Sequence, residues 1–211
     1  MGEGQGWGVR VGIVGGTFDP IHLGHTALAE WAAECAGLDK VLLVPAGQPP
    51  HRGNAMAPAA DRLEMCRLAA AGHPRLEISD LELRREGPSY SVDTIRELGR
   101  ERPDAELFLV LGWDAARELR SWREPDTVLR LATLVIVSRP GFPEPTVEDV
   151  RRAGIDPACV VLCGVGTPEI EATDVRRLLE TGGSLDGLVD PAVEAYLRRR
   201  GLYGPHHDGR G

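Results

Sequence analysis

The chain has 211 residues, of which 42% are hydrophobic and 27% charged, and its formal net charge is -8. This length and composition predict one globular domain that can bury a sizeable core. The acidic balance argues against nucleic acid as a partner, because such binding needs a basic surface. No apolar run of about 18 residues and no secretory signal is found, so we expect no membrane partner and a cytoplasmic location.

The cysteines, Cys35, Cys66, Cys159 and Cys163, do not follow the paired spacing that is typical of zinc ligands. In a reducing compartment we expect all of them to be buried free thiols. Only one of the 24 basic residues, Lys40, is a lysine. Any phosphate-binding role therefore falls to arginine and histidine, whose side chains suit it.

Short apolar runs alternate with helical patterns along the chain. The runs predict strands at Val9–Val14, Lys40–Pro45, Leu76–Ser79, Glu106–Leu111, Leu134–Ser138 and Val160–Leu162. The other patterns predict helices at Leu23–Ala36, Ala59–Ala71, Ser91–Arg102, Ala115–Ser121, Pro125–Leu131, Val147–Ala153, Thr173–Glu180 and Pro191–Arg199. This alternation indicates a Rossmann-like α/β fold, a doubly wound parallel sheet with helices on both faces and a small helical C-terminal part.

We expect the domain to span residues 9–203, between a flexible N-terminus (residues 1–8) and a disordered tail (residues 204–211). In a doubly wound sheet, ligands bind at the carboxyl ends of strands, near the point where the strand order reverses. Segments that directly follow predicted strands are therefore the first places to look for function.

The most informative segment follows the first predicted strand and reads Gly-Gly-Thr-Phe-Asp-Pro-Ile-His-Leu-Gly-His, residues 15–25. Glycines between a strand and a helix let the backbone approach a phosphate, and the amides of the helix N-terminus attract anions. His22 and His25 lie three residues apart and so face the same way on the first helical turn. Because no G-x-G-x-x-G is present, the segment favours nucleotide chemistry over a generic dinucleotide site.

Further candidates follow in chain order. A rigid, proline-rich loop after the second strand carries His51 and Arg52, which suit a phosphate but would equally suit a solvated turn. Ser91 begins a helix, where it could cap the helix or help to hold a carboxylate. Asp114 follows the fourth strand, where it could cap a helix or accept hydrogen bonds from ribose hydroxyls. Trp122 is flanked by charged residues, so stacking on a flat ligand ring competes with half-buried packing.

Near the C-terminus, Thr173 opens a helix whose first-turn amides form a candidate anion site. Arg176 lies about one turn later on a nearby face of the same helix. An arginine and a hydroxyl at a helix start are groups that phosphate oxygens accept well.

Together these segments resemble the bacterial nicotinate-nucleotide adenylyltransferases, a family in the nucleotidyltransferase superfamily that carries an H-x-G-H signature. The resemblance runs from about Val9 to Tyr203. Its motifs are Gly15–His25, Pro49–Arg52, Ser89–Ser91, Gly112 with Asp114, Trp122, Ser138–Gly141 and Gly201–Tyr203. One position departs from the family pattern: Glu171 stands where the phosphate motif usually has its first serine.

The resemblance implies an enzyme of NAD biosynthesis that joins ATP and nicotinic acid mononucleotide into deamido-NAD and pyrophosphate. The mononucleotide phosphate would attack in line, with Mg²⁺ bound through the substrate phosphates and no metal held by the protein alone. The implied catalytic residues are His22, His25 and Arg176. The implied ATP-binding residues are Gly15, Gly16, Thr17, Phe18, His22, His25, Gly112, Asp114, Arg139, Thr173 and Arg176. The implied mononucleotide-binding residues are His51, Arg52, Tyr90, Ser91 and Trp122. Whether the protein forms a homo-oligomer stays open.

Two other functions also stay open. Another adenylyl- or cytidylyltransferase of the superfamily, acting on nicotinamide mononucleotide or phosphopantetheine, would share the first motif. A non-catalytic nucleotide sensor would keep the fold. Glu171 favours the sensor, because a carboxylate beside the triphosphate of ATP would repel the phosphates. The intact pair of His22 and His25 argues against the sensor.

Overall fold

Parallel strands in the order β3-β2-β1-β4-β5-β6 form the sheet at the centre of the protein. The computed structural model describes residues 8–49, 55–138 and 144–204. The strands are β1 (Arg10–Gly16), β2 (Lys40–Pro45), β3 (Leu76–Ile78), β4 (Glu106–Gly112), β5 (Thr133–Ser138) and β6 (Val160–Val165). The order reverses between β1 and β4, which confirms the predicted doubly wound sheet.

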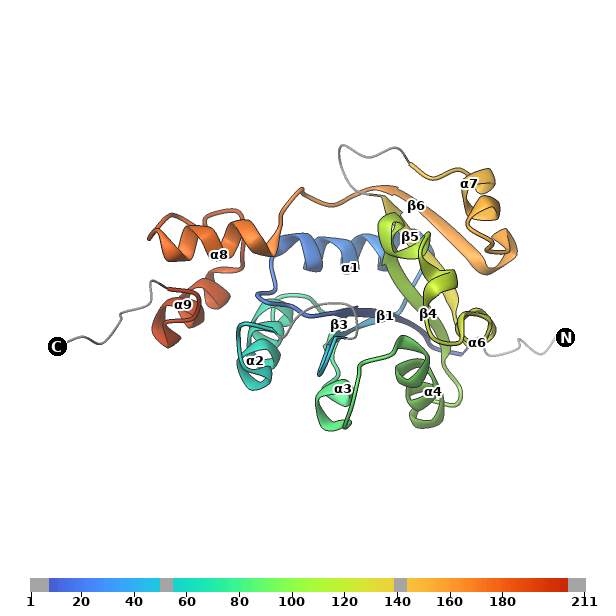
Figure 1. Ribbon diagram of the computed structural model, residues 1–211, viewed down its shortest axis with the longest axis horizontal. Helices are drawn as coiled ribbons and strands as arrows, with labels where there is room; N and C mark the ends of the chain where they lie inside the picture. The colour runs from blue at the N-terminus through green and yellow to red at the C-terminus, as the bar shows by residue number, and fades with distance from the viewer. Residues whose placement is uncertain (1–7, 50–54, 139–143, 205–211) are drawn as a thin grey trace, which may run out of the picture.

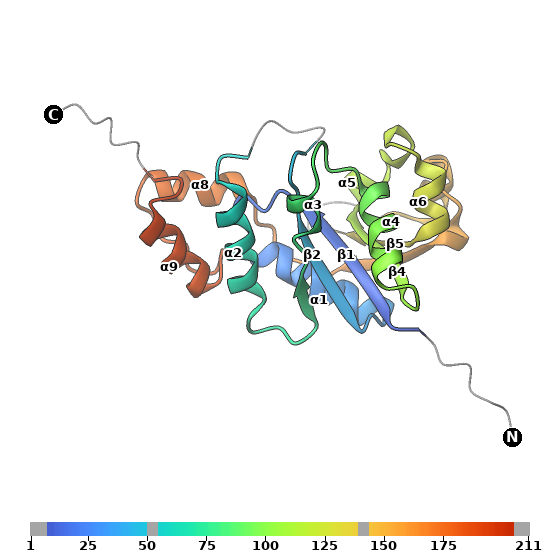
Figure 2. The ribbon, with the colours of Figure 1, turned by 90° about the horizontal axis from the view of Figure 1, so that it is seen from below.

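Helices cover both faces of this sheet (Figure 1). They are α1 (Leu23–Ala36), α2 (Ala59–Ala70), α3 (Leu81–Arg84), α4 (Ser91–Glu101), α5 (Trp113–Ala116), α6 (Pro125–Leu131), α7 (Val147–Arg152), α8 (Ala172–Glu180) and α9 (Pro191–Arg200), with 3-10 turns η1 (Leu119–Ser121) and η2 (Pro157–Cys159). Helices α1, α2, α8 and α9 share one core with the sheet, and α3, α4, α6 and α7 share the other. Helices α8 and α9 lie beside α2 at one end of the molecule (Figure 2).

The two cores explain why the strands are apolar almost throughout. In β1, Val11 and Ile13 enter the core with α4, whereas Val14 enters the core with α1. Successive side chains of a strand point to opposite faces, so a strand that is covered on both faces must be apolar at nearly every position. None of the helices in the described residues is long and apolar enough to cross a membrane.

Several predicted boundaries are wrong by a few residues. The predicted helix Ala115–Ser121 is divided into α5, which ends at Ala116, and η1, which begins at Leu119. Ala116 and Leu119 are both fully buried and lie three residues apart, a spacing that a 3-10 turn places on one side. Strand β6 continues to Val165 instead of ending at Leu162, because Cys163 pairs with Val137 and Val165 with Ser138, with a register shift that skips Gly164. Helix α3 is missing from the predicted helices, because four residues are too few to show a helical period in the sequence.

The expectation of four free thiols is wrong for two of them. Cys35 of α1 and Cys163 of β6 form a disulfide across 128 residues of sequence, whereas Cys66 and Cys159 are free. Spacing along the chain cannot reveal this pair, because packing of α1 against the edge strand brings it together. Burial raises the pKa of the Cys66 thiol. The predicted flexible N-terminus and disordered tail lie, apart from Gly8 and Gly204, outside the described residues.

Candidate functional site

The predicted site residues that follow β1 and β4 lie at one edge of the sheet. Strand β1 ends at Gly16, shortly before α1, and β4 ends at Gly112, directly before α5. The two strands are neighbours, and the strand order reverses between them. This is the place where open α/β sheets bind ligands, so the fold places the H-x-G-H segment and Asp114 on either side of a natural ligand site.

His22 and His25 stand together at the start of α1. Their rings stack with centroids 3.7 Å apart and an angle of 28° between planes. The backbone N–H of His22 donates to Nδ1 of His25 over 3.2 Å, so the neutral His25 ring carries its proton on Nε2. The Phe18 ring meets His25 edge-on at 5.0 Å. Gly24 leaves room for this pair, because a Cβ there would lie 3.0 Å from Nδ1 of His22.

The turn between β1 and α1 presents backbone rather than side chains. A Cβ on Gly15 would meet no described atom within 4 Å, so internal packing does not require glycine there. A ligand that approaches the backbone closely would require it. Phe18 has a positive φ of 49°, and the whole residue is only 2% exposed, so its ring supports His25 from within the core. Neither its ring nor its backbone offers much surface to a nucleotide.

Helix α8 brings Thr173 and Arg176 to this turn from the far end of the sequence. Nη1 of Arg176 donates to the carbonyl of Asp19 over 2.6 Å. Nη2 of the same guanidinium donates to Oγ1 of Thr173 over 3.3 Å. A cation, an exposed hydroxyl and the two histidines therefore lie within one neighbourhood, and all of them can donate hydrogen bonds to phosphate oxygens.

Glu171 is the N-cap residue of α8, where its exposed side chain makes no capping hydrogen bond. A carboxylate at a helix N-terminus interacts favourably with the helix dipole, which offsets part of its repulsion of a bound phosphate. A serine at this position, as the family pattern has it, could accept a hydrogen bond from an amide of the first turn.

A second group of site residues surrounds the start of α4. Oγ of Ser89 accepts hydrogen bonds from the amides of Gly47 and Gln48, over 2.9 and 3.3 Å, and so ties the loop after β2 to this segment. The Arg123 guanidinium lies over the Tyr90 ring, 4.8 Å from its centroid. The stretch after η1, which contains Trp122, is thus held beside the Tyr90 segment.

Ser91 does not have the capping role that was considered for it, whereas Trp122 is half-buried as its packing role requires. Tyr90 is the N-cap of α4 and Ser91 its first residue, so the capping role considered for Ser91 is wrong by one position. Trp122 is half-buried against the core that contains α4. Asp114 is exposed in the first turn of α5 and makes no capping bond, which leaves its carboxylate available to a ligand. Gly112 is the buried N-cap of the same helix.

Three residues that the sequence reasoning did not assign complete the turn after β1. The buried carboxylate of Asp19 accepts hydrogen bonds from the amides of Met56 and Ala57 and from the hydroxyl of Tyr203. Arg62 is only 2% exposed, and its Nη1 donates to the carbonyl of Thr17 over 2.7 Å. Asp19 and Tyr203 belong to the recognised motifs, whereas nothing in the sequence distinguishes Arg62 from other helix arginines.

Other parts of the expected site are not described. His51, Arg52 and Arg139 lie outside the described residues. Ser138, directly before Arg139, is buried at the carboxyl end of β5, and its hydroxyl has no hydrogen-bond partner within the described chain. The described residues contain no cluster of three or more His, Cys, Asp or Glu that could hold a metal ion.

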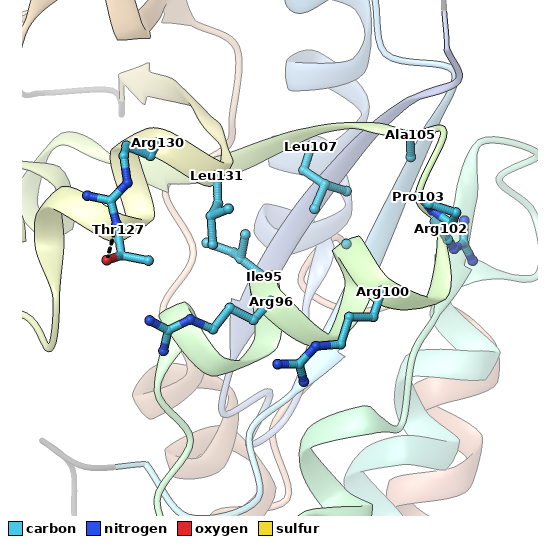
Figure 3. Close-up of a pocket in the computed structure, with 11 residues that line it drawn as sticks. Ile95, Arg96, Arg100, Arg102, Pro103, Ala105, Leu107, Thr127, Arg130 and Leu131 are labelled. Atoms are coloured by element: carbon cyan, nitrogen blue, oxygen red, sulfur yellow. Dashed lines mark hydrogen bonds between the residues drawn. The ribbon is translucent and has the colours of Figure 1, made fainter.

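A groove of about 490 Å³ lies elsewhere, between α4 and α6 (Figure 3). Its wall includes Ala105 and Leu107, at the amino end of β4, whereas the site residues follow the carboxyl end of that strand. The arginines around it are Arg96, Arg100, Arg102 and Arg130. Arg96 pairs with Glu124 and Arg102 with Glu77, so carboxylates already neutralise part of this charge. The residues that line the groove include none of the predicted site residues.

Comparison with known proteins identifies the family of the chain. The model of the cytidylyltransferase-like family matches residues 13–178. A Thermus thermophilus protein named "Probable nicotinate-nucleotide adenylyltransferase" is 46% identical over 92% of this chain and 100% of its own length. A protein of the same name from Dehalococcoides mccartyi is 39% identical over 92% of this chain and 97% of its own length.

Solved structures show the same fold at low identity. The Plasmodium falciparum nicotinic acid mononucleotide adenylyltransferase, complexed with NaAD, superimposes with a TM-score of 0.76 at 16% identity, over 92% of this chain and 97% of that chain. Two bacterial relatives that the chain matches over nearly their whole length share a name, and the family model spans both halves of the sheet. The chain therefore belongs to the nicotinate-nucleotide adenylyltransferases, a family of cytidylyltransferase-like proteins.

Proposed function

We propose that this protein transfers the adenylyl group of ATP to nicotinic acid mononucleotide, forming deamido-NAD and releasing pyrophosphate. The observation that carries the proposal is the contact of Arg176 with the turn that holds His22 and His25, since it gathers phosphate-binding groups from both ends of the chain. The names of the relatives in this family support the choice of substrates.

The reaction needs no base to activate its nucleophile. An oxygen of the mononucleotide phosphate is already anionic and can attack the α-phosphorus of ATP. As the new P–O bond forms, the bond to the bridging oxygen of the β-phosphate breaks and pyrophosphate leaves. Catalysis must then come from orientation and from stabilisation of negative charge. Histidine, arginine and backbone amides are the groups that this task requires.

The ATP half of the site follows from the contacts around α1 and α8. His25 would donate from Nε2, because its Nδ1 already accepts the His22 amide. Arg176 and Thr173 would bind the β- and γ-phosphates, which become the leaving group. Gly15, Gly16 and Thr17 would allow the phosphates to approach the backbone, and Asp114 would accept hydrogen bonds from a ribose. We further propose that the undescribed Arg139 belongs to this half.

Magnesium fits this site only as a companion of the substrate. Mg²⁺ prefers oxygen ligands, whereas the gathered side chains around Arg176 and His25 are nitrogen donors that suit phosphate oxygens. When bound through the phosphates of ATP, Mg²⁺ would supply partial neutralisation of their charge. The protein residues would orient that complex rather than build a metal site of their own.

The mononucleotide half would lie around the start of α4. Trp122 would stack on the pyridine ring, and His51 and Arg52 would lie on the phosphate side. The amide of Asp93 already donates to the carbonyl of Tyr90, so the amides of Ser91 and Val92 at the start of α4 are the ones that would donate to the ring carboxylate. The amide NH₂ of nicotinamide mononucleotide is itself a donor and could not accept hydrogen bonds from these backbone amides. The site should therefore prefer nicotinic acid mononucleotide.

The decisive experiment measures pyrophosphate release from MgATP with nicotinic acid mononucleotide, nicotinamide mononucleotide or phosphopantetheine as the second substrate. We expect fast release with the acid and slow release with the amide. Release with phosphopantetheine alone would keep the superfamily and overturn the substrate. ATP binding without release from any of them would instead indicate a nucleotide sensor.

We also propose that the enzyme works in the cytoplasm, where ATP and pyridine nucleotides meet. The Cys35–Cys163 disulfide makes this proposal testable, because cytoplasmic thiols are usually kept reduced. The protein can be trapped with a thiol-alkylating reagent at cell lysis. Alkylation of Cys35 and Cys163 would show that they are reduced in the cell, and protection from alkylation would show that the disulfide is present there.

A further inference from the structure

Asp19 is the residue on which three separate parts of the chain converge. Its carboxylate accepts hydrogen bonds from the amides of Met56 and Ala57, over 2.8 and 3.0 Å, and from the hydroxyl of Tyr203. Its backbone carbonyl accepts the 2.6 Å hydrogen bond from Arg176. One residue in the turn after β1 thus joins the end of the loop after β2, helix α8 and the last described turn of the chain.

Tyr203 is held in an unusual conformation at this point. Its φ is +56°, in a region that costs a non-glycine residue energy, and it is only 9% exposed. Burial, and next the hydrogen bond to Asp19, raise the pKa of the Tyr203 hydroxyl, so it stays protonated and donates. The fold therefore tolerates backbone strain at Tyr203 while it keeps a buried hydroxyl on a buried carboxylate.

Arg62 fixes the same turn from another side. Its Nη1 donates to the carbonyl of Thr17, two residues before Asp19. Burial lowers the pKa of the Arg62 guanidinium, and the negative charge of Asp19 partly offsets that effect. The turn is thus held by the Arg62 guanidinium, which bonds to Thr17, and by the Tyr203 hydroxyl, which bonds to Asp19. Neither group has a role of its own toward a substrate in the proposed reaction.

We infer that Tyr203 is a positioning residue for the adenylyl transfer, acting through Asp19 on the placement of Arg176 and of the turn that precedes His22. The inference rests on the proposed function for its reaction. Without the hydroxyl, the Asp19 carboxylate would lose one of the three donors that it has among the described residues, and it could shift. The carbonyl that anchors Arg176 belongs to the same residue and would shift with it. Small displacements of a catalytic group reduce rate strongly.

The chain supplies a matched control for this hydroxyl. Tyr196 of α9 donates a 2.6 Å hydrogen bond to the buried Asp61 of α2, and Asp61 also keeps a second donor, Arg200. Tyr196→Phe therefore removes the same chemical group from the same kind of partner in the same C-terminal part. It leaves Asp19 and Arg176 untouched.

We expect Tyr203→Phe to lower kcat/KM for ATP about tenfold, which is about 1.4 kcal/mol of transition-state stabilisation. Tyr196→Phe should stay within about twofold of the wild type, although both variants lose a hydrogen bond to a buried carboxylate and should melt at similar temperatures. Equal activity of the two variants would overturn the inference. So would a loss in both that follows their melting temperatures.

A double-mutant cycle with Arg176→Ala tests the route of the effect. If Tyr203 acts through Arg176, then Tyr203→Phe should change kcat/KM far less in the Arg176→Ala background than in the wild type. Independent, multiplicative losses would show that Tyr203 supports only the general structure, and the positioning role would be rejected.

A binding measurement separates this inference from the proposed function. Titration calorimetry with MgATP alone should show weaker binding to Tyr203→Phe than to Tyr196→Phe, because Arg176 is misplaced before any chemistry. If the wild type binds MgATP but transfers nothing to the mononucleotide, the proposed function fails while this comparison still decides the role of Tyr203. Equal affinities of the two variants would reject that role.

Discussion

His25 makes three supporting contacts with two neighbours, His22 and Phe18, and these contacts leave its Nε2 for another task. The His22 amide donates to Nδ1, the His22 ring stacks on one face, and the Phe18 ring meets it edge-on. A side chain with this many neighbours has few alternative rotamers, so its Nε2 proton is fixed in place before substrate arrives. Such preorganisation is the source of most electrostatic catalysis.

Replacing this side chain tests the assignment. We expect His25→Ala to lower kcat by about 10²–10³, the loss typical of one preorganised donor. The change also removes the acceptor of the His22 amide at the start of α1, which should cost about 1 kcal/mol and lower Tm by about 2–4 °C. Steady-state kinetics and thermal melts measure the two effects. Near-normal turnover would contradict the assignment of His25.

Glu171 offers the opposite kind of test, because its side chain makes no capping bond. We expect Glu171→Ser to stabilise α8 by about 1 kcal/mol as a new N-cap while KM for ATP changes little. Thermal melts and ATP titrations of the variant provide the comparison. A large gain in ATP affinity would show that the carboxylate does oppose the triphosphate.

Between elements, the contacts around Tyr90 join the segments of the proposed mononucleotide site, which do not share a strand or a helix. Ser89 ties the start of α4 to the loop after β2, and Arg123 over the Tyr90 ring ties it to the segment after η1. An ion pair of 3.7 Å between Arg123 and Asp93 adds to this junction. Trp122 directly precedes Arg123 and so lies next to this junction.

Trp122→Ala should therefore raise KM for the mononucleotide by about 3–10-fold, the equivalent of one aromatic stacking contact. KM for ATP should remain near its wild-type value, because the ATP groups come from α1 and α8. Kinetics with each substrate varied separately provide the check. Equal increases in both KM values would mean that Trp122 serves only as packing against the core.

The disulfide between α1 and β6 acts at the same scale, because it joins the helix that carries the histidines to the strand that leads toward α8. Nε1 of Trp31 reinforces the junction by donating to the carbonyl of Gly164 over 2.9 Å. A cross-link of two segments 128 residues apart removes much entropy from the unfolded chain, typically about 2–4 kcal/mol of stability.

We expect Cys35→Ser to lower Tm under non-reducing conditions, and a reductant to lower the wild-type Tm to the same value. Cys159→Ser, which removes a free thiol, should leave Tm unchanged. Thiol titration of the denatured wild type should find only Cys66 and Cys159 reactive. Reaction of all four cysteines before reduction would show that the bond is absent.

At the scale of the whole molecule, the C-terminal helices complete the core on one side of the sheet and also carry site residues. Helix α8 supplies Arg176, and the turn after α9 supplies Tyr203. Helix α9 is attached to α2 through Asp61, which accepts hydrogen bonds from Tyr196 and Arg200, over 2.6 and 3.0 Å. The junction therefore contributes to the attachment of α9, and its contacts do not include Asp19 or Arg176.

The junction should make stability depend on acid. The Tyr196 hydrogen bond first, and then the bond from Arg200, hold the pKa of Asp61 below its ordinary value. A carboxylate with a lowered pKa contributes its stability above the pKa of the unfolded chain, about 3.9, and loses it as pH falls through the folded pKa. Wild-type Tm should thus fall steeply below about pH 4.

Asp61→Asn should have a lower Tm at neutral pH and a flatter decline in acid than the wild type. Asp126→Asn serves as the control, because Asp126 pairs with Arg120 on the exposed surface, where ion pairs contribute little. Thermal melts at several pH values between 2 and 7 distinguish the two variants. Parallel pH profiles for the wild type and Asp61→Asn would contradict the role of Asp61.

The sequence by itself determined the class of the fold, and it supplied most of the candidate site residues. Apolar runs in alternation with helical patterns require a parallel sheet with both faces covered, because each strand must be buried on two sides. The Gly15–His25 segment shows its chemistry locally, since its glycines, helix start and paired histidines all lie within eleven residues. Local patterns of this kind survive in any tertiary context.

Only the tertiary structure decided how distant segments meet. The bond between Arg176 and Asp19 spans 157 residues, and that between Tyr203 and Asp19 spans 184. The Cys35–Cys163 disulfide and the burial of Arg62 are equally invisible in spacing along the chain. These contacts depend on which helix packs beside which strand, and the free energy of that packing is summed over many residues rather than contained in any one motif.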